Sequence, residues 1–64
     1  MANENALPDI GRPARRALDE LGITTLDQVA RMSERELLAV HGVGPNAVRI
    51  LGEALADRGQ TLAS

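Results

Sequence analysis

The stretch Val40–Ala47, VHGVGPNA, carries the strongest structural signal in the chain. Two glycines, Gly42 and Gly44, flank one apolar residue, and Pro45 follows at once. Glycine permits tight turns and close backbone approach because it has no Cβ, and proline is favoured at the first position of a helix. The stretch therefore predicts a tight turn that leads directly into a helix, and we call it the second glycine turn.

A weaker form of the same pattern occurs at Ile10–Ala14, IGRPA, which we call the first glycine turn. When Ile10 is aligned with Val43, five of eleven positions are identical at one constant offset. The identical pairs are Gly11 with Gly44, Ala14 with Ala47, Arg16 with Arg49, Leu18 with Leu51 and Glu20 with Glu53. Because a unit that cannot bury its apolar face alone needs a second copy, we expect one core made from two units.

Helix signals divide the chain into four helical segments. No segment shows the alternation of apolar and polar residues that is typical of a strand. Residues 1–6 are expected to form a flexible tail and residues 7–62 the folded domain. The first helix should begin near Arg12 or Pro13 and stop at Gly22. The others are expected at Leu26–Met32 after a Thr25 cap, at Glu34–Val40 after a Ser33–Glu36 capping box, and from Pro45 to Gly59. The apolar residues Leu37, Leu38 and Val40 lead into the second glycine turn. Residues expected to face the core are Ala14, Ala17, Leu18, Leu21, Leu26, Val29, Ala30, Met32, Val43, Ala47, Val48, Leu51, Ala54 and Leu55.

Composition excludes several classes of function. The 64 residues contain no cysteine and one histidine, His41, so neither a disulfide nor a zinc site is expected. No nucleophile, base or metal set is visible, so we expect no enzymatic activity, cofactor or small-molecule substrate. No apolar run approaches the roughly 20 residues that span a bilayer, and the first residues lack signal-peptide features. A cytoplasmic monomer with no membrane contact is expected.

Charge and aromatic content limit the ways in which the chain could bind nucleic acid. Aromatic residues are absent, which removes base stacking as a source of single-strand affinity, and the net charge of -2 opposes strong diffuse attraction. Positive charge nevertheless gathers at the first glycine turn, where Arg12, Arg15 and Arg16 give +3 over residues 11–16.

Both glycine turns lead to a helix N-terminus, where backbone N–H groups lack intrahelical partners and the helix dipole favours an anion. A phosphate oxygen is therefore the expected ligand. The alternative is that glycine and proline only make tight connections between helices.

The stretch from Gly42 to Leu51 resembles the helix-hairpin-helix motif of DNA-binding and repair proteins. From Leu7 to Leu62 the pattern is similar to the C-terminal domain of the bacterial RNA polymerase alpha subunit, which takes part in transcription. The residues that carry this resemblance are Leu18, residues 22–26 (GITTL), residues 33–38 (SERELL), Gly44 and residues 55–62. The resemblance implies an all-α bundle of about five short helices, in which two helix-hairpin-helix units are related by an approximate twofold.

The family's DNA-contacting side chains are replaced at several matching positions. Its principal arginine falls on Pro13 and the asparagine partner on Arg16, while its lysine and the following serine fall on Asn46 and Ala47. The glycine is retained as Gly44. What the resemblance implies here is therefore contact through backbone amides and displaced arginines.

We expect a DNA-binding module that is weak, largely independent of sequence, and directed at duplex phosphates. The expected contact residues are Gly11, Arg12, Arg15, Arg16, Gly42, Gly44, Asn46, Ala47 and Arg49. A second interpretation is a protein-interaction module that docks on RNA polymerase or another DNA-associated factor. Arg15, Arg16 and Arg49 also lie four residues before an acidic residue, so each has the alternative of an intrahelical ion pair.

Overall fold

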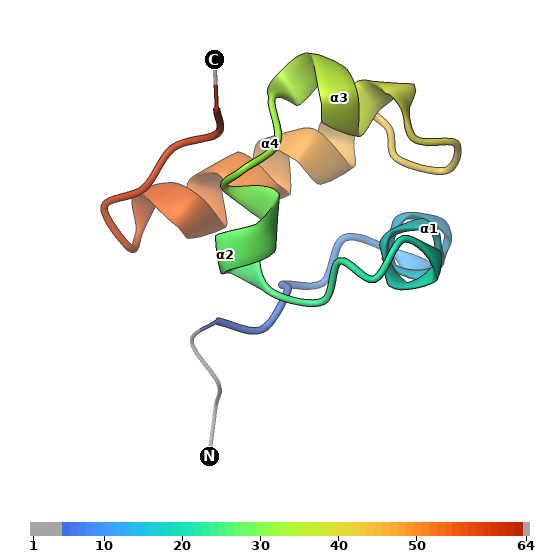
Figure 1. Ribbon diagram of the computed structural model, residues 1–64, viewed down its shortest axis with the longest axis horizontal. Coiled ribbons are helices and arrows are strands. Elements are labelled where there is room, and N and C mark those ends of the chain that lie inside the picture. Colours follow the sequence, from blue (N-terminus) through green and yellow to red (C-terminus); the bar gives the residue numbers. More distant parts are fainter. Residues whose placement is uncertain (1–4, 64) are drawn as a thin grey trace.

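The computed structural model describes residues 5–63, which contain four α-helices (Figure 1). These are α1 at Arg12–Glu20, α2 at Leu26–Val29, α3 at Glu34–Ala39 and α4 at Pro45–Ala56. Within the described residues the strand-like pairings are two isolated bridges, Ala6 with Thr25 and Ser33 with Ala63. The all-α prediction is confirmed for this part of the chain.

The expected number of about five helices is wrong, since residues 5–63 form four. The segment before α1 contains Pro8, which has no N–H to donate, and Gly11, whose φ is 90°. After α4 the chain turns at Gly59, whose φ is 73°. Neither flanking segment therefore adds a helix.

The starts of the two short helices follow local capping rules. Thr25 Oγ1 accepts a hydrogen bond from the Gln28 N–H at 3.2 Å, which starts α2. Ser33 Oγ accepts from the Glu36 N–H at 3.1 Å, and Glu36 Oε1 accepts from the Ser33 N–H at 2.9 Å, which starts α3. Both predicted caps are confirmed, and the Gln28 side chain completes a second capping box that the sequence analysis did not identify.

Helix ends depart from the expected boundaries by a few residues. α2 stops at Val29 and does not reach Met32, because the N–H groups of Arg31 and Met32 bond carbonyls three residues back, those of Gln28 and Val29, and so do not continue the α-helical pattern. α3 stops at Ala39 because Val40 is extended (φ -76°, ψ 124°) and leads into the second glycine turn. α4 ends at Ala56, three residues before Gly59.

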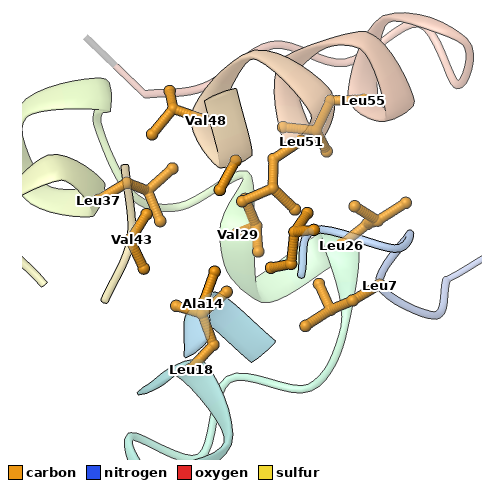
Figure 2. Close-up of a cluster of buried hydrophobic side chains, with 12 residues drawn as sticks. Leu7, Ala14, Leu18, Leu26, Val29, Leu37, Val43, Val48, Leu51 and Leu55 are labelled. Carbon is orange, nitrogen blue, oxygen red and sulfur yellow. The ribbon is translucent and has the colours of Figure 1, made fainter. Parts of the chain in front are cut away.

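An aliphatic core holds the helices together (Figure 2). Its buried members are Leu7, Ile10, Ala14, Leu18, Leu26, Val29, Leu37, Val43, Ala47, Val48, Leu51 and Leu55. Leu21, expected to face this core, is instead 58% exposed. α1 ends one residue earlier and Gly22 turns the chain at φ 76°, so Leu21 leaves the helix on the solvent side.

The helices enclose this core from different directions. In Figure 1, α1 is seen end-on while α4 lies across the view, so their axes cross. α2 and α3 both contact α4. The first turn of α1 lies next to the loop that connects α3 with α4, because Gly42 in that loop packs on Pro13 and Ala17 of α1.

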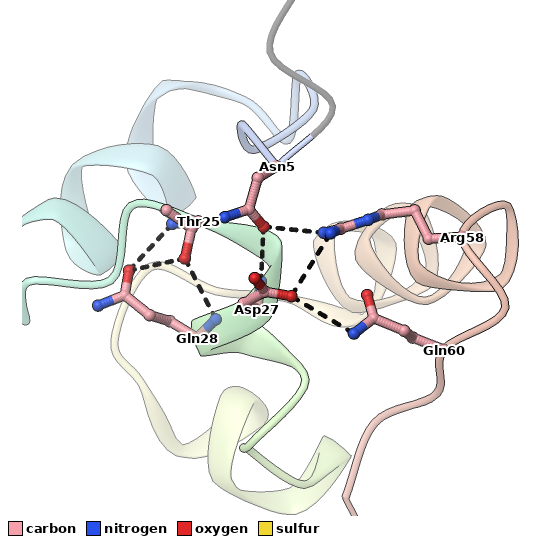
Figure 3. Close-up of polar contacts among 6 residues, drawn as sticks. All are labelled: Asn5, Thr25, Asp27, Gln28, Arg58 and Gln60. Atoms are coloured by element: carbon pink, nitrogen blue, oxygen red, sulfur yellow. Dashed lines mark hydrogen bonds and ion pairs between the residues drawn. The ribbon is translucent and has the colours of Figure 1, made fainter.

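Asn5 bonds the N-terminal segment to the start of α2 and to Arg58, just beyond α4 (Figure 3). The Asn5 carbonyl accepts from the Leu26 N–H at 2.8 Å, and Asn5 Oδ1 accepts from the Asp27 N–H at 3.0 Å and from Arg58 Nη1 at 2.8 Å. The expected flexible tail covered residues 1–6, of which residues 1–4 lie outside the described part of the chain. Asn5, by contrast, joins the start of α2 to the end of α4.

Candidate nucleic-acid interface

The two longer helices begin differently from the two short ones. α1 and α4 each have a glycine at the N-cap, Gly11 and Gly44, and glycine has no side chain with which to cap a helix. α2 and α3 are capped by Thr25 and Ser33. Orphan N–H groups at a helix start attract anions when no side chain satisfies them. The helices that follow the glycine turns therefore have the starts best suited to a phosphate.

The second glycine turn packs directly on α1. A Cβ added at Gly42 would lie 3.0 Å from the Pro13 carbonyl oxygen and 3.4 Å from Ala17 Cβ, and the φ of Gly42 is 98°. Only glycine combines that backbone conformation with so close an approach. Gly42 thereby brings the start of α1 beside the turn that leads into α4, so the fold unites two segments far apart in the sequence.

Val43 and Gly44 have complementary roles within this turn. The Val43 side chain is buried, which confirms the expectation that it tucks beneath the turn. Gly44 has an ordinary extended conformation (φ -105°, ψ 178°), and a Cβ there would meet nothing within 4 Å. The buried valine anchors the turn, and the space beside Gly44 is open to a ligand.

The first glycine turn has an acidic neighbour, Asp9, that is not among the contact residues expected from the sequence. The Gly11 N–H donates to Asp9 Oδ1 at 3.1 Å. An aspartate two residues before a glycine has the spacing for a local side-chain to backbone bond, so the signal was present in the sequence. The start of α1 is therefore partly occupied by a carboxylate, whereas no side chain caps the start of α4.

Arg12 is the most available cation at the interface. Arg12 is exposed, and within the described residues its guanidinium has neither an ion pair nor a hydrogen bond. It lies at the first position of α1, directly after Gly11. The side chain can therefore reach a phosphate without breaking an internal contact.

The other three arginines form the ion pairs that their spacing allows. Arg15 Nε lies 4.0 Å from Asp19 Oδ1, Arg16 Nε lies 3.8 Å from Glu20 Oε1, and Arg49 Nη1 lies 2.8 Å from Glu53 Oε1. All six side chains are at least half exposed. Exposed pairs of this kind contribute only about 0–1 kcal/mol. A phosphate can therefore compete for each arginine, and phosphate contact stays a prediction.

Asn46 and Ala47 lie in the first turn of α4 but differ in accessibility. Asn46 Oδ1 accepts from Arg49 Nη2 at 2.8 Å, so these two predicted contact residues are joined on the surface. The Ala47 side chain is 5% exposed and belongs to the core. Only the backbone N–H of Ala47 is therefore a candidate for phosphate binding.

A shallow hollow runs beside the packed turns. One part is lined by Pro13, Arg16, Ala17, Glu20, His41 and Gly42. An adjoining part is lined by Ala17, Glu20, Leu21, Ala39, Val40 and His41. The two parts share Ala17, Glu20 and His41, so the hollow extends from the glycine turns to the exposed Leu21, and the part at Leu21 is the more apolar of the two.

The rest of the described chain offers no metal centre or membrane span. Residues 5–63 contain no group of three His, Asp or Glu side chains placed to hold a metal ion. None of the helices in that range is long and apolar enough to cross a bilayer.

Comparison with known proteins adds no assignment: no protein-family model, curated protein or solved structure matches this chain.

Proposed function

We propose that this protein binds double-stranded DNA weakly and with little sequence preference, through the two glycine turns and the arginines beside them. The observation that carries the proposal is that the second glycine turn packs on the start of α1, through Gly42 against Pro13 and Ala17, while α1 and α4 both begin at a glycine N-cap. In this proposal the turns are two helix-hairpin-helix units related by an approximate twofold, as in the polymerase alpha domain that the sequence resembles.

The distribution of charge along α1 supports a ligand at its start. Arg12, Arg15 and Arg16 lie toward the N-terminus, while Asp19 and Glu20 lie at the C-terminus. The helix dipole favours the opposite arrangement, in which acids precede bases, by about 0.3–1 kcal/mol per charge. The α1 sequence therefore concentrates positive charge where it does not help the helix, and an external anion accounts for this placement.

The contacts available explain why binding is expected to be weak and tolerant of sequence. Backbone N–H groups and arginines reach phosphates, which position a protein on DNA without reading bases. The overall charge of -2 adds no long-range attraction. The logarithm of the binding constant should fall with the logarithm of salt concentration by about 0.9 for each phosphate neutralised, which is a shallow slope for a few contacts.

Gly44→Asp provides a direct test. Gly44 already has the extended backbone of an N-cap, and aspartate is a preferred N-cap residue, so the variant should fold at least as stably as the wild type. Its carboxylate would occupy the N–H groups that the proposal assigns to phosphate. Duplex DNA binding at low salt should therefore fall at least tenfold while the melting temperature holds or rises.

Ser33→Asp is the matched control, because it adds the same charge at the N-cap of α3, a helix that no glycine turn precedes. It should retain most of the affinity for duplex DNA. Equal binding by Gly44→Asp and the wild type would refute the proposed role of the second glycine turn. Absence of binding by the wild type at low salt would refute the function itself.

A protein-interaction module is the second candidate, and one observation favours it. Leu21 is 58% exposed at the apolar end of the hollow that Ala39 and Val40 also line. An apolar side chain of a partner such as RNA polymerase would fit this end. Replacing Leu21 with serine should then abolish partner binding and leave DNA binding unchanged, as measured by titration with each partner.

A further inference from the structure

The internal repeat preserves a pair of charges as well as a turn. Arg16 and Arg49 occupy equivalent positions in the two units, and so do Glu20 and Glu53. The structure joins both pairs: Arg16 lies 3.8 Å from Glu20, and Arg49 lies 2.8 Å from Glu53. Each unit thus presents one arginine to the proposed DNA interface and holds that arginine with a glutamate one helical turn further on.

Helix stabilisation explains this repeated pair poorly. A glutamate that precedes a base by four residues suits the helix dipole, whereas a glutamate that follows it does not. Here both glutamates follow, and Glu20 is the last residue of α1. The helices also lack acids in the first turn and bases in the last turn, in both α1 and α4.

Two further acidic side chains bond groups at the proposed DNA interface. Asp19 lies 4.0 Å from Arg15, and Asp9 accepts the N–H of Gly11 at 3.1 Å. Each of these acidic oxygens stands where a phosphate oxygen would otherwise bind an N–H or guanidinium group. Carboxylate and phosphate oxygens are interchangeable acceptors for such donors.

We infer that the repeated Arg–Glu pairs restrain DNA binding from within, with Glu20 and Glu53 holding in the free protein the arginines that phosphates take up in the complex. This inference rests on the proposed function. DNA binding then replaces the glutamate carboxylate beside each arginine with a phosphate, so each glutamate lowers the affinity for DNA. The effect is greatest at Glu53, since its contact with Arg49 is the shortest of the three pairs.

The test compares Glu53→Gln with Asp57→Asn in titrations of a fluorescently labelled mixed-sequence duplex at low salt. Asp57 follows α4 directly, about one turn beyond Glu53, and takes part in no ion pair within the described residues. Both substitutions remove one negative charge without changing side-chain size. Glu53→Gln should tighten binding by about twofold to fivefold, the range that exposed ion pairs allow, and Asp57→Asn should tighten it less.

A double-mutant cycle with Arg49→Ala separates the pair from general charge. If Glu53 acts by holding Arg49, the gain from Glu53→Gln should shrink to that of Asp57→Asn when Arg49 is absent. Equal gains from the two charge removals, or an unchanged gain in the Arg49→Ala background, would overturn the inference while leaving DNA binding intact. If the wild type and every variant fail to bind, the proposed function falls, and the inference with it.

Discussion

Alanine substitutions at the glycines of the two turns should lower the free energy of unfolding by different amounts. The backbone conformation and the space around each glycine determine the amount. Gly42→Ala faces two penalties, because its φ is 98° and its new Cβ would lie 3.0 Å from the Pro13 carbonyl oxygen. A non-glycine residue held in a sparsely populated backbone region costs about 1–3 kcal/mol. The close contact adds to this figure, so a total loss of about 2–4 kcal/mol is expected.

Gly11 and Gly44 provide the two controls in this series. Gly11→Ala has strained backbone at φ 90° but open space around the new Cβ, so it should cost about 1–3 kcal/mol. Gly44→Ala has neither strain nor a contact within 4 Å. Alanine is a poorer N-cap than glycine, but it reduces the entropy of the unfolded chain, so the net change should stay within about 1 kcal/mol.

Urea denaturation followed by far-ultraviolet circular dichroism measures this series directly. The chain has no Trp, Tyr or Phe, so intrinsic fluorescence provides no signal. A domain of this length has a total stability of about 3–10 kcal/mol, so Gly42→Ala should lower the midpoint greatly or unfold the chain. Equal midpoints for Gly42→Ala and Gly44→Ala would refute the proposed packing of the second glycine turn against α1.

Three further changes test the fold and its charge distribution. Ser33→Ala removes the cap of α3 and should lower the free energy of unfolding by about 0.5–2 kcal/mol in urea denaturation, and no change would contradict the capping role. Leu51→Ala empties a fully buried site and should cost about 2–5 kcal/mol, enough to unfold much of the population at 25 °C by circular dichroism. Arg12→Glu should stabilise the start of α1 by about 0.3–1 kcal/mol yet weaken duplex binding, and tighter binding would contradict the proposed interface.

The starts of the helices could be predicted from the sequence because the chemistry that starts a helix is local. Ser33 and Glu36 satisfy each other's backbone N–H groups across three residues, and the spacing alone identifies them. The ends of the helices could be predicted less well from the sequence. α2 ends early since Arg31 and Met32 bond carbonyls three residues back, and Leu21 is exposed since α1 stops at Glu20.

Contacts between distant segments could not be predicted, because no local pattern encodes them. Asn5 bonds Arg58 across 53 positions, and Gly42 meets Pro13 only after the chain has closed on α1. For the candidate site the outcome is mixed. The Arg49–Glu53 pair and the inward-facing side chain of Ala47 follow from helical spacing, whereas the bond from Gly11 to Asp9 emerged from the structure.

The central claim is that the two glycine turns form one surface for duplex DNA, and an amide chemical-shift titration with a short duplex tests it most directly. Residues 11–16 and 42–49 should shift together and titrate with one apparent affinity that weakens as salt is added. Proline lacks an amide proton, so Pro13 and Pro45 are silent. Shifts confined to α2 or α3, or none at low salt, would contradict the claim.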